Sequence, residues 1–174
     1  AEAVARLGRA GHAADEIAAL SVTSTSGTLC LVDEAGATVG PAMMYSDQRA
    51  VAEAREVQAA GREWSERVGP QFSASFALSR LRWLQVHDPA RLARARWYLS
   101  PTDLVVGWLS GEWGVSDWTN MLKSGYDVVT LAWPAFIERD LGLPLARFPR
   151  VQAPGSVIGR VSAAAAQRTG LSTL

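Results

Sequence analysis

Hydrophobic residues change their spacing along the chain, and each spacing predicts a different element. In residues 50–57 and again in residues 77–84, apolar side chains recur at the interval of one helical face. Short apolar runs at residues 29–32 and 97–99 indicate strands. A helix-compatible stretch, residues 2–9, opens the chain. This mixture of helices and strands predicts an α/β or α+β architecture.

Several helix ends are marked by residues that favour those positions. Residues 100–103, Ser-Pro-Thr-Asp, are a strong signal for a helix start, and Asp88 followed by Pro89 predicts another. Gly170 is expected to end a helix over residues 162–169. These helices therefore have boundaries that the sequence defines locally.

Two further strands are expected, together with the loops that separate them. One strand is expected to begin at Ile17, and another to cover residues 156–161. Residues 34–36, Glu-Ala-Gly, are typical of a turn between strands. Residues 133–141 predict a short helix, and the three prolines of residues 143–154 favour an extended or looped segment.

Composition limits the class of protein. The chain has 174 residues, of which 48% are hydrophobic and 20% charged, as expected for one globular domain. Lys plus Arg and Asp plus Glu number 17 each, so the charge balance favours neither nucleic acid nor an anionic membrane as a partner. No stretch approaches the roughly 20 apolar residues that span a bilayer, and no signal-peptide pattern opens the chain. We therefore expect a cytoplasmic location.

Single residues of two types add to this. Cys30 is the only cysteine, which rules out an internal disulfide, and its place in an apolar run predicts a buried, inert thiol. Lys123 is the only lysine among many arginines, which we interpret as a compositional habit rather than a functional signal. The chain begins at Ala1, inside a predicted helix and without Met, so we expect it to be a piece of a longer protein.

Candidate chemistry gathers in residues 19–49. There, a hydroxyl-rich loop interrupts two apolar runs, and Asp47 and Arg49 follow at the far end. Side chains of these types offer donors and acceptors suited to a polyhydroxylated ligand. A second polar segment, residues 115–120, contains Trp118, whose ring either stacks on the apolar face of a sugar or packs in the interior.

Other candidate sites receive less support from the sequence. His12 and His87 lack the spacing of metal ligands, and no phosphate loop of the Walker type is present. Trp83 and Trp108 on helical faces, and Trp97 in a strand, are expected to lie in the core. We predict no metal site within this chain.

Taken together, the motifs resemble the N-terminal domain of the FGGY carbohydrate kinases, which include xylulokinases, ribulokinases, gluconokinases and glycerol kinases. Five stretches carry the resemblance in the same order: SVTSTSGTLCLVDEAG, PAMMYSDQRA, LSPTDLVVGWLSGE, SDWTNMLKSGYDV and, more weakly, APGSVIGRVSAAAAQRTGLSTL. They cover nearly the whole chain. The loop chemistry looks most like that of the xylulokinase and ribulokinase group.

The resemblance implies an α/β fold of the ribonuclease H-like (actin/hexokinase) type, with a mixed sheet and flanking helices. It also implies that residues 1–174 are a partial sugar-binding domain, from which the first strand and the C-terminal ATP-binding domain are absent. Loss of that strand would expose backbone donors and acceptors at a sheet edge. We therefore expect this edge to be covered by another chain, as in a homo-oligomer, by a rearranged terminus, or by crystal contacts.

By the same resemblance, specific residues are assigned to a sugar site. Those expected to face the sugar are Thr25, Ser26, Gly27, Asp117, Trp118 and Asn120. Asp47 and Arg49 are expected to pair and brace the site, and Asp103 is interpreted as an early-helix charge rather than a ligand contact. Glycerol kinases have Gln-Arg-Glu where this chain has residues 25–27, so a ketopentose or related polyol is expected instead of glycerol.

The parts that act on phosphate are expected outside the sequence. The family's Asp-x-Gly-Thr turn would precede Ala1, and its general-base Asp would lie beyond Leu174. ATP and Mg²⁺ are thus expected in the full-length parent, with neither bound to this chain, which alone is expected to be inactive. Two alternatives remain open: a non-catalytic carbohydrate-binding or interaction module of the same fold, and an unrelated α/β domain whose hydroxyl loop is merely a turn.

Overall fold

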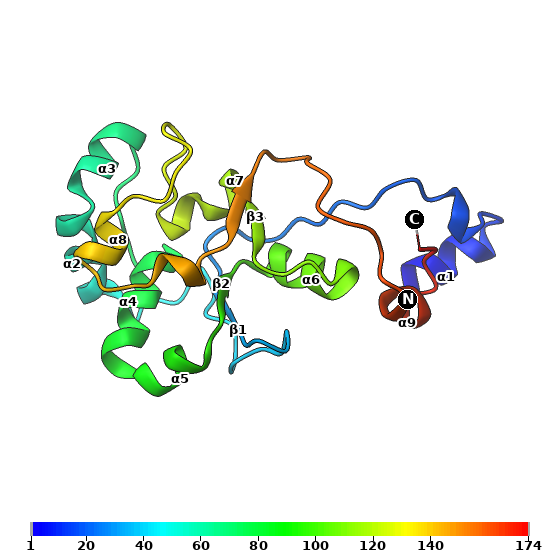
Figure 1. Cartoon of the computed structure of the whole chain (residues 1–174), viewed down its shortest axis with the longest axis horizontal. Helices are drawn as coiled ribbons and strands as arrows, with labels where there is room; N and C mark the ends of the chain where they lie inside the picture. Colours follow the sequence, from blue (N-terminus) through cyan, green and yellow to red (C-terminus); the bar gives the residue numbers. More distant parts are fainter. Residues whose placement is uncertain (1, 174) are drawn as a thin grey trace.

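The computed structural model describes residues 2–173 and consists of short helices around short strands (Figure 1). Its α-helices are α1 (Glu2–Arg9), α2 (Val51–Ala60), α3 (Arg62–Val68), α4 (Ala77–His87), α5 (Pro89–Arg94), α6 (Pro101–Ser110), α7 (Trp118–Met121), α8 (Phe136–Arg139) and α9 (Ala163–Thr169). Its strands are β1 (Cys30–Val32), β2 (Trp97–Leu99), β3 (Val115–Asp117) and β4 (Arg150–Gln152), and its 3₁₀ helices are η1 (Ala14–Glu16), η2 (Leu122–Ser124) and η3 (Leu145–Arg147).

Two regions differ in how they are built. Residues 29–152 form a packed lobe that contains every strand and helices α2 to α8. Helices α1 and α9 lie beside each other at the opposite end of the molecule, and two extended segments, residues 17–25 and 156–161, connect them to the lobe (Figure 1).

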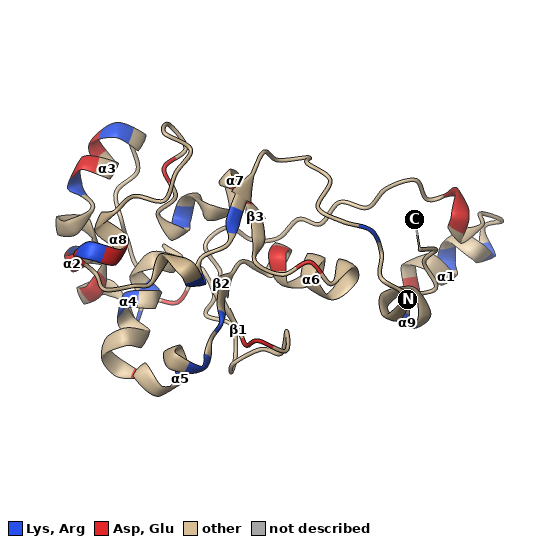
Figure 2. Cartoon of the chain, in the orientation of Figure 1, with Lys and Arg blue, Asp and Glu red and all other residues tan. Residues whose placement is uncertain are grey.

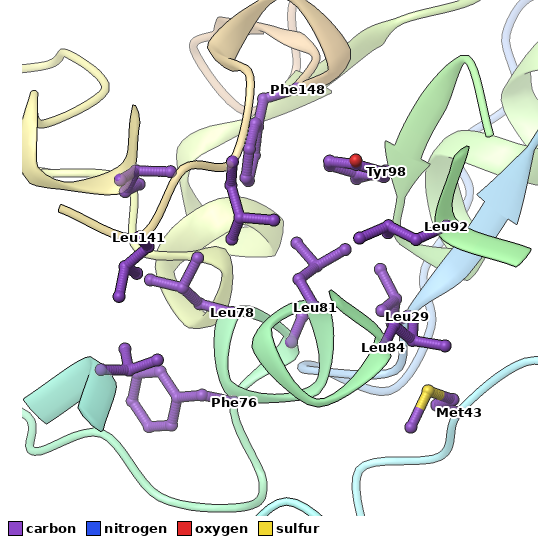
Figure 3. Close-up of a cluster of buried hydrophobic side chains, with 14 of the residues drawn as sticks. Leu29, Met43, Phe76, Leu78, Leu81, Leu84, Leu92, Tyr98, Leu141 and Phe148 are labelled. Carbon is purple, nitrogen blue, oxygen red and sulfur yellow. The ribbon is translucent and has the colours of Figure 1, made fainter. Parts of the chain in front are cut away.

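Helix α4 is the centre of the packed lobe. Its side chains Leu78, Leu81 and Leu84 are fully buried and face apolar residues from β1, β2 and the segment before β4 (Figure 3). Burial on this scale is the main source of the lobe's stability, at about 1.5 to 3 kcal/mol for each fully buried large apolar side chain. Four aromatic rings, Trp64, Phe72, Phe76 and Phe136, pack edge to face or tilted at one end of α4.

The strands form two small sheets. Strands β1 and β2 pair antiparallel, with Cys30 opposite Leu99, whereas β3 and β4 pair parallel, with Val115 opposite Arg150. A hairpin follows β1, because the Asp33 carboxylate accepts the backbone N–H groups of Ala35 and Ala37 across the expected turn. Among residues 2–173, the expected single mixed sheet is therefore replaced by two separate two-stranded sheets, one antiparallel and one parallel.

Most locally marked helices are confirmed. At the start of α6, the Ser100 hydroxyl accepts the Asp103 N–H and the Asp103 carboxylate accepts the Ser100 N–H. At the start of α5, the Asp88 carboxylate accepts the Arg91 N–H. Gly170 ends α9 in the left-handed conformation. The predicted helix over residues 2–9 is α1.

The strands expected from Ile17 and over residues 156–161 are wrong. Both segments are extended, but neither forms a ladder with another segment among residues 2–173. A run of apolar residues can favour an extended backbone, whereas a strand also requires a neighbour that supplies hydrogen-bonding groups. The sequence therefore predicted the extended backbone of both segments, but not that they would lack a partner strand among residues 2–173.

The expectations about which single residues are buried are confirmed for Cys30 but not for all of the tryptophans. Cys30 is buried, and burial, with a smaller contribution from the Asp103 charge, raises the pKa of its thiol to about 11, as befits an inert residue. Trp108 is not in the core, because 46% of it is exposed while its indole N–H donates to the Gly36 carbonyl. Trp83 and Trp97 are only partly buried.

No helix among residues 2–173 has the length and apolar character needed to cross a bilayer.

Candidate functional site

The hydroxyl-rich loop that precedes β1 is fixed at both ends by hydrogen bonds. The Ser24 hydroxyl bonds the Thr102 hydroxyl at 2.7 Å and accepts the Thr102 backbone N–H, which ties the loop to the first turn of α6. At the other end, the Thr28 hydroxyl bonds that of Thr25 at 3.0 Å and accepts the Tyr45 N–H. Thr25 and Ser26 remain exposed between these anchors, so their side chains are accessible to a ligand.

Gly27 is the point at which this loop comes closest to the rest of the lobe. Its φ of +83° is one that L side chains rarely adopt. A Cβ atom at this position would lie 2.5 Å from the Ser75 carbonyl oxygen and 2.8 Å from Cδ of Lys123. Only glycine therefore permits this approach.

Arg80 of α4 binds the same loop from the interior of the lobe. It is fully buried, and its guanidinium donates to the Gly27 carbonyl at 2.5 Å and to the Tyr45 carbonyl at 2.8 Å. Burial lowers the pKa of Arg80, and the nearby charge of Asp47 partly opposes that shift. Because its Nε has no partner among the described residues, Arg80 contributes a buried positive charge that is only partly compensated.

Asp117 lies at the end of β3 and caps the short helix α7. One carboxylate oxygen accepts the backbone N–H groups of Thr119 and Asn120 and the Thr119 hydroxyl, and the other accepts the Asn120 side-chain amide at 2.6 Å. Burial alone would raise the pKa of Asp117, but these hydrogen bonds lower it below its usual range. Asp117 is therefore ionised at neutral pH.

Asp47 and Arg49 form the expected pair. Arg49 Nε lies 2.8 Å from the Asp47 carboxylate, and the Asp47 side chain is only 17% exposed. The Arg49 guanidinium also lies 5.0 Å from the centre of the Trp83 ring, just before α2. Although burial opposes it, hydrogen bonding from Arg49 lowers the pKa of Asp47, so the pair is charged at neutral pH.

Two of the sequence-predicted groups are neighbours in space. Gly27, in the loop, contacts Lys123 of η2, which directly follows α7 and its capping residue Asp117. The loop of residues 25–27 and the segment of residues 117–120 therefore belong to one part of the lobe. Trp118 is partly buried, which agrees with either of the two interpretations given to its ring.

A largely apolar groove of about 680 Å³ lies next to this region. It is lined by residues 17–22 and 155–161, by side chains of α6, and by Asp117. Asp117 is the one predicted sugar-site residue that lines it, so among the described residues the groove and the loop share this single carboxylate. The groove's chemistry is unlike that of a sugar site, whereas the loop presents hydroxyl groups.

Three neighbouring residues were not singled out as site residues by the sequence. From the sequence, Arg80 had no role in the site and Lys123 only the interpretation of a compositional habit, yet both contact Gly27. Asp103 is only 4% exposed and accepts the Ser100 N–H at 2.7 Å and the Ser116 hydroxyl at 2.6 Å. Burial raises the pKa of Asp103 to about 6 despite those bonds. The rarity of lysine was the only available signal for Lys123.

Among residues 2–173, no three His, Cys, Asp or Glu side chains are grouped closely enough to hold a metal ion.

Comparison with known proteins gives this arrangement a context. The family model described as "FGGY family of carbohydrate kinases, N-terminal domain" matches residues 2–173. This chain belongs to the FGGY family of carbohydrate kinases. The resemblance inferred from the motifs is thereby confirmed.

Individual FGGY proteins are similar along nearly the whole chain. A xylulose kinase of Streptomyces coelicolor is 33% identical over 159 residues, which cover 89% of this chain and 33% of that protein. A glycerol kinase of Chromobacterium violaceum is 30% identical over 173 residues, or 94% of this chain and 34% of that protein. The crystal structure of a xylulose kinase from Rhodospirillum rubrum matches with a TM-score of 0.81 at 27% identity, covering 88% of this chain and 32% of that one.

These matches confirm the expected α/β fold of the actin/hexokinase type. They also show that this chain spans about a third of the length of the relatives it matches.

Proposed function

We propose that this chain is the sugar-binding part of an ATP-dependent carbohydrate kinase that acts on a ketopentose of the D-xylulose or D-ribulose type, or on a related polyol. The observation that carries the proposal is the contact between Gly27 and Lys123, which makes neighbours of the loop and of the segment after β3. Family membership and the similarity to xylulose kinases support the choice of reaction.

Within that site, each residue has a distinct proposed role. The Ser26 hydroxyl bonds a sugar hydroxyl. Gly27 lets the loop lie close against the Ser75 carbonyl and the Lys123 stem, which holds Ser26 in place. Trp118 packs on the apolar face of the sugar, while Asp117 and Asn120 supply polar atoms beside it. Thr25 completes the hydroxyl edge. The Asp47–Arg49 pair braces the segment that carries the Tyr45 carbonyl, which Arg80 binds.

The phosphoryl-transfer machinery is proposed to come from the rest of the protein. The resemblance places the Asp-x-Gly-Thr turn that meets phosphate and metal before Ala1, so we propose that ATP and Mg²⁺ are held by the rest of the protein. When bound to the whole protein, they would supply the phosphoryl group and neutralise its charge. We propose that a general-base Asp beyond Leu174 receives the proton of the sugar hydroxyl. We also propose that the isolated chain is inactive, and that the full-length parent works in the cytoplasm.

The extended segment of residues 17–25 supports a further part of the proposal. Its backbone is drawn out without a partner strand among residues 2–173, and it lines the apolar groove. We propose that the first strand of the full domain pairs with it, and that in the isolated chain a second copy takes that place. Size-exclusion chromatography that gives a clean monomer with a cooperative melt contradicts the second statement.

A non-catalytic module of the same fold is the competing function. The complete gene separates the two, since a kinase requires Asp-x-Gly-Thr before Ala1 and an Asp within about 20 residues after Leu174, the distance at which the resemblance places the general base.

The deciding experiment is a sugar-panel ATPase assay on the complete gene product, with D-xylulose, D-ribulose, xylitol, gluconate and glycerol. Glycerol is included because glycerol kinases are also similar to this chain. Ser26→Ala and Trp118→Ala should each lower kcat/KM on the best sugar, by about tenfold, the usual cost of one lost hydrogen bond or stacking contact. Thr130→Ala removes an exposed hydroxyl that makes no side-chain bond and should leave kcat/KM unchanged.

If both site variants match the parent while the sugar is still phosphorylated, the site assignment is wrong and the kinase function stands. If none of the sugars stimulates the conversion of ATP to ADP with formation of a sugar phosphate, the kinase function itself is contradicted.

A further inference from the structure

Lys123 occupies an unusual position for the only lysine of the chain. Its stem lies over Gly27, and the contact is so close that a Cβ on Gly27 would meet Lys123 Cδ at 2.8 Å. The residue belongs to η2, immediately after the predicted sugar-facing segment of residues 117–120. Lys123 therefore bridges the two stretches to which the sugar site has been assigned.

The ammonium group of Lys123 has no hydrogen bond and no ion pair with any residue in the range 2–173. Most arginines of the lobe behave differently: Arg49, Arg67 and Arg82, for example, each pair with a carboxylate. The nearest aromatic contact is the Phe76 ring, at 6.0 Å from Nζ, which is the outer limit of a useful cation–π interaction. Neither kind of partner accounts for the charge.

A purely structural role explains only part of this geometry. The four-carbon stem packs on the loop and half-buries the side chain, as lysine stems commonly do. Methionine or leucine would provide the same apolar contact without a charge. Arg80, the other cation at this loop, already donates a hydrogen bond to the Gly27 carbonyl from the interior. The positive charge of Lys123 is therefore not needed to satisfy that carbonyl.

We propose that Lys123 is a specificity-determining residue whose ammonium donates a hydrogen bond to an acceptor oxygen, hydroxyl or carbonyl, of the bound sugar. The inference rests on the proposed sugar-binding function and extends it to a residue outside the predicted set. A hydrogen bond from a charged donor is among the stronger single contacts to a neutral sugar. The stem of Lys123 lies beside Gly27, the residue that directly follows the exposed Ser26 in the loop, so the side chain reaches the part of the loop assigned to the sugar.

Chemical modification tests the contact directly, because Lys123 carries the only side-chain amine in this chain. The complete gene product is treated with an amine-acylating succinimidyl ester, with and without saturating D-xylulose or the best sugar of the panel, and the peptide containing Lys123 is quantified by mass spectrometry. We expect the sugar to slow acylation of Lys123 at least about fivefold, because at saturation only a small fraction of the protein has a free site and an accessible amine. A non-substrate sugar serves as the matched control and should not protect.

Substitution gives a second, independent readout. Lys123→Met keeps an apolar stem over Gly27, so it should raise KM about tenfold, the usual cost of a hydrogen bond to a charged group, with kcat changed less than about twofold. Lys123→Arg should retain most of the affinity. Arg55→Met removes an exposed cation that has no ion pair among the described residues and should leave KM unchanged.

Equal acylation rates with and without the substrate, together with an unchanged KM in Lys123→Met, overturn the inference while sugar phosphorylation by the parent protein leaves the proposed function intact. If no sugar is bound or phosphorylated, the proposed function fails and this inference fails with it.

Discussion

The packed lobe and the two extended segments are built from similarly apolar sequence, but only the lobe buries it. In the lobe, Leu78, Leu81 and Leu84 are completely buried around α4 (Figure 3). In the extended segments, Leu20 is 49% exposed and Val157 is 88% exposed. Charge does not explain the difference, because the segments carry a single charged residue, Arg160, while α2, α3, α4 and α8 of the lobe each carry charged residues (Figure 2).

The difference lies in partners. In the lobe, α2 packs on α4, and α6 packs on the small sheet of β1 and β2. The extended segments have no ladder among residues 2–173, and they line the apolar groove together with side chains of α6. An apolar, β-prone sequence contributes to stability only where another surface removes it from water. The lobe thus supplies its own partners, which agrees with the proposal that the extended segments obtain theirs from the rest of the protein.

The largest expected effect is in the core of the lobe. Leu81→Ala should lower the free energy of unfolding by about 3 to 5 kcal/mol, because it leaves a cavity where no neighbour can fill the space. Val157→Ala, the matched change in an extended segment, should cost less than about 0.5 kcal/mol. Urea unfolding of the two variants measures the contrast. Similar losses would mean that Val157 is buried in solution, and the comparison between the regions would fail.

Two glycines allow the same comparison between the packed lobe and an extended segment, with smaller expected changes in stability. Gly27 and Gly155 have nearly the same φ, +83° and +81°, but only Gly27 has atoms packed where a Cβ would stand. Gly155→Ala should cost about 1 kcal/mol from backbone strain alone, whereas Gly27→Ala should cost about 2 to 3 kcal/mol because it also meets the rigid Ser75 carbonyl.

Thermal or urea unfolding gives the difference between these variants. If both alanines cost the same, the approach of Ser75 to Gly27 is looser in solution than in the structure, and the positions of Arg80 and Lys123 around the loop would need revision.

The smallest expected effect concerns pH. Burial raises the pKa of Asp103 to about 6 in the folded protein, above its ordinary value of 3.8. As pH falls from about 6 to 4, the folded state therefore takes up a proton that the unfolded chain does not yet bind. Stability contributed by this group should rise by about 1 to 2 kcal/mol over that window and be lost again as pH returns to neutrality.

Asp103→Asn carries no titrating carboxyl, so its unfolding free energy should lack this slope between pH 4 and 6. Asp127 provides the opposite sign, because hydrogen bonds from the Thr130 N–H and the Arg67 side chain, against the effect of burial, lower its pKa. Its contribution is lost only as pH falls below about 4. A slope that persists in Asp103→Asn between pH 4 and 6 would show that another group titrates there.

Much of the fold was predictable because its signals act within a few residues. The start of α6 depends on Ser100 and Asp103, that of α5 on Asp88, and the hairpin turn on Asp33, and each bond closes over two to four positions. The periodic apolar face of α4 identified the central helix in the same way, although the sequence did not show that Arg80 lies on the buried side.

The site was predicted in outline by its motifs rather than by its geometry. The ordered stretches led to the FGGY family, and the family match confirms that step. The roles of Ser26, Trp118 and the other assigned residues stay predictions. Arg80 and Lys123 could not be found in this way, because their importance comes from contact with Gly27, which lies more than fifty residues from each along the chain.

The sequence by itself determined the capped helices, the turn after β1, the burial of Cys30 and the family, since each depends on local residue preferences or on an ordered set of motifs. Only the tertiary structure decided that residues 17–25 and 156–161 form no ladder with another segment of residues 2–173, that Trp108 is exposed, and that Lys123 and Arg80 both contact Gly27. Pairing, burial and the meeting of charges depend on which distant segments occupy the neighbouring space, and no local pattern contains that information.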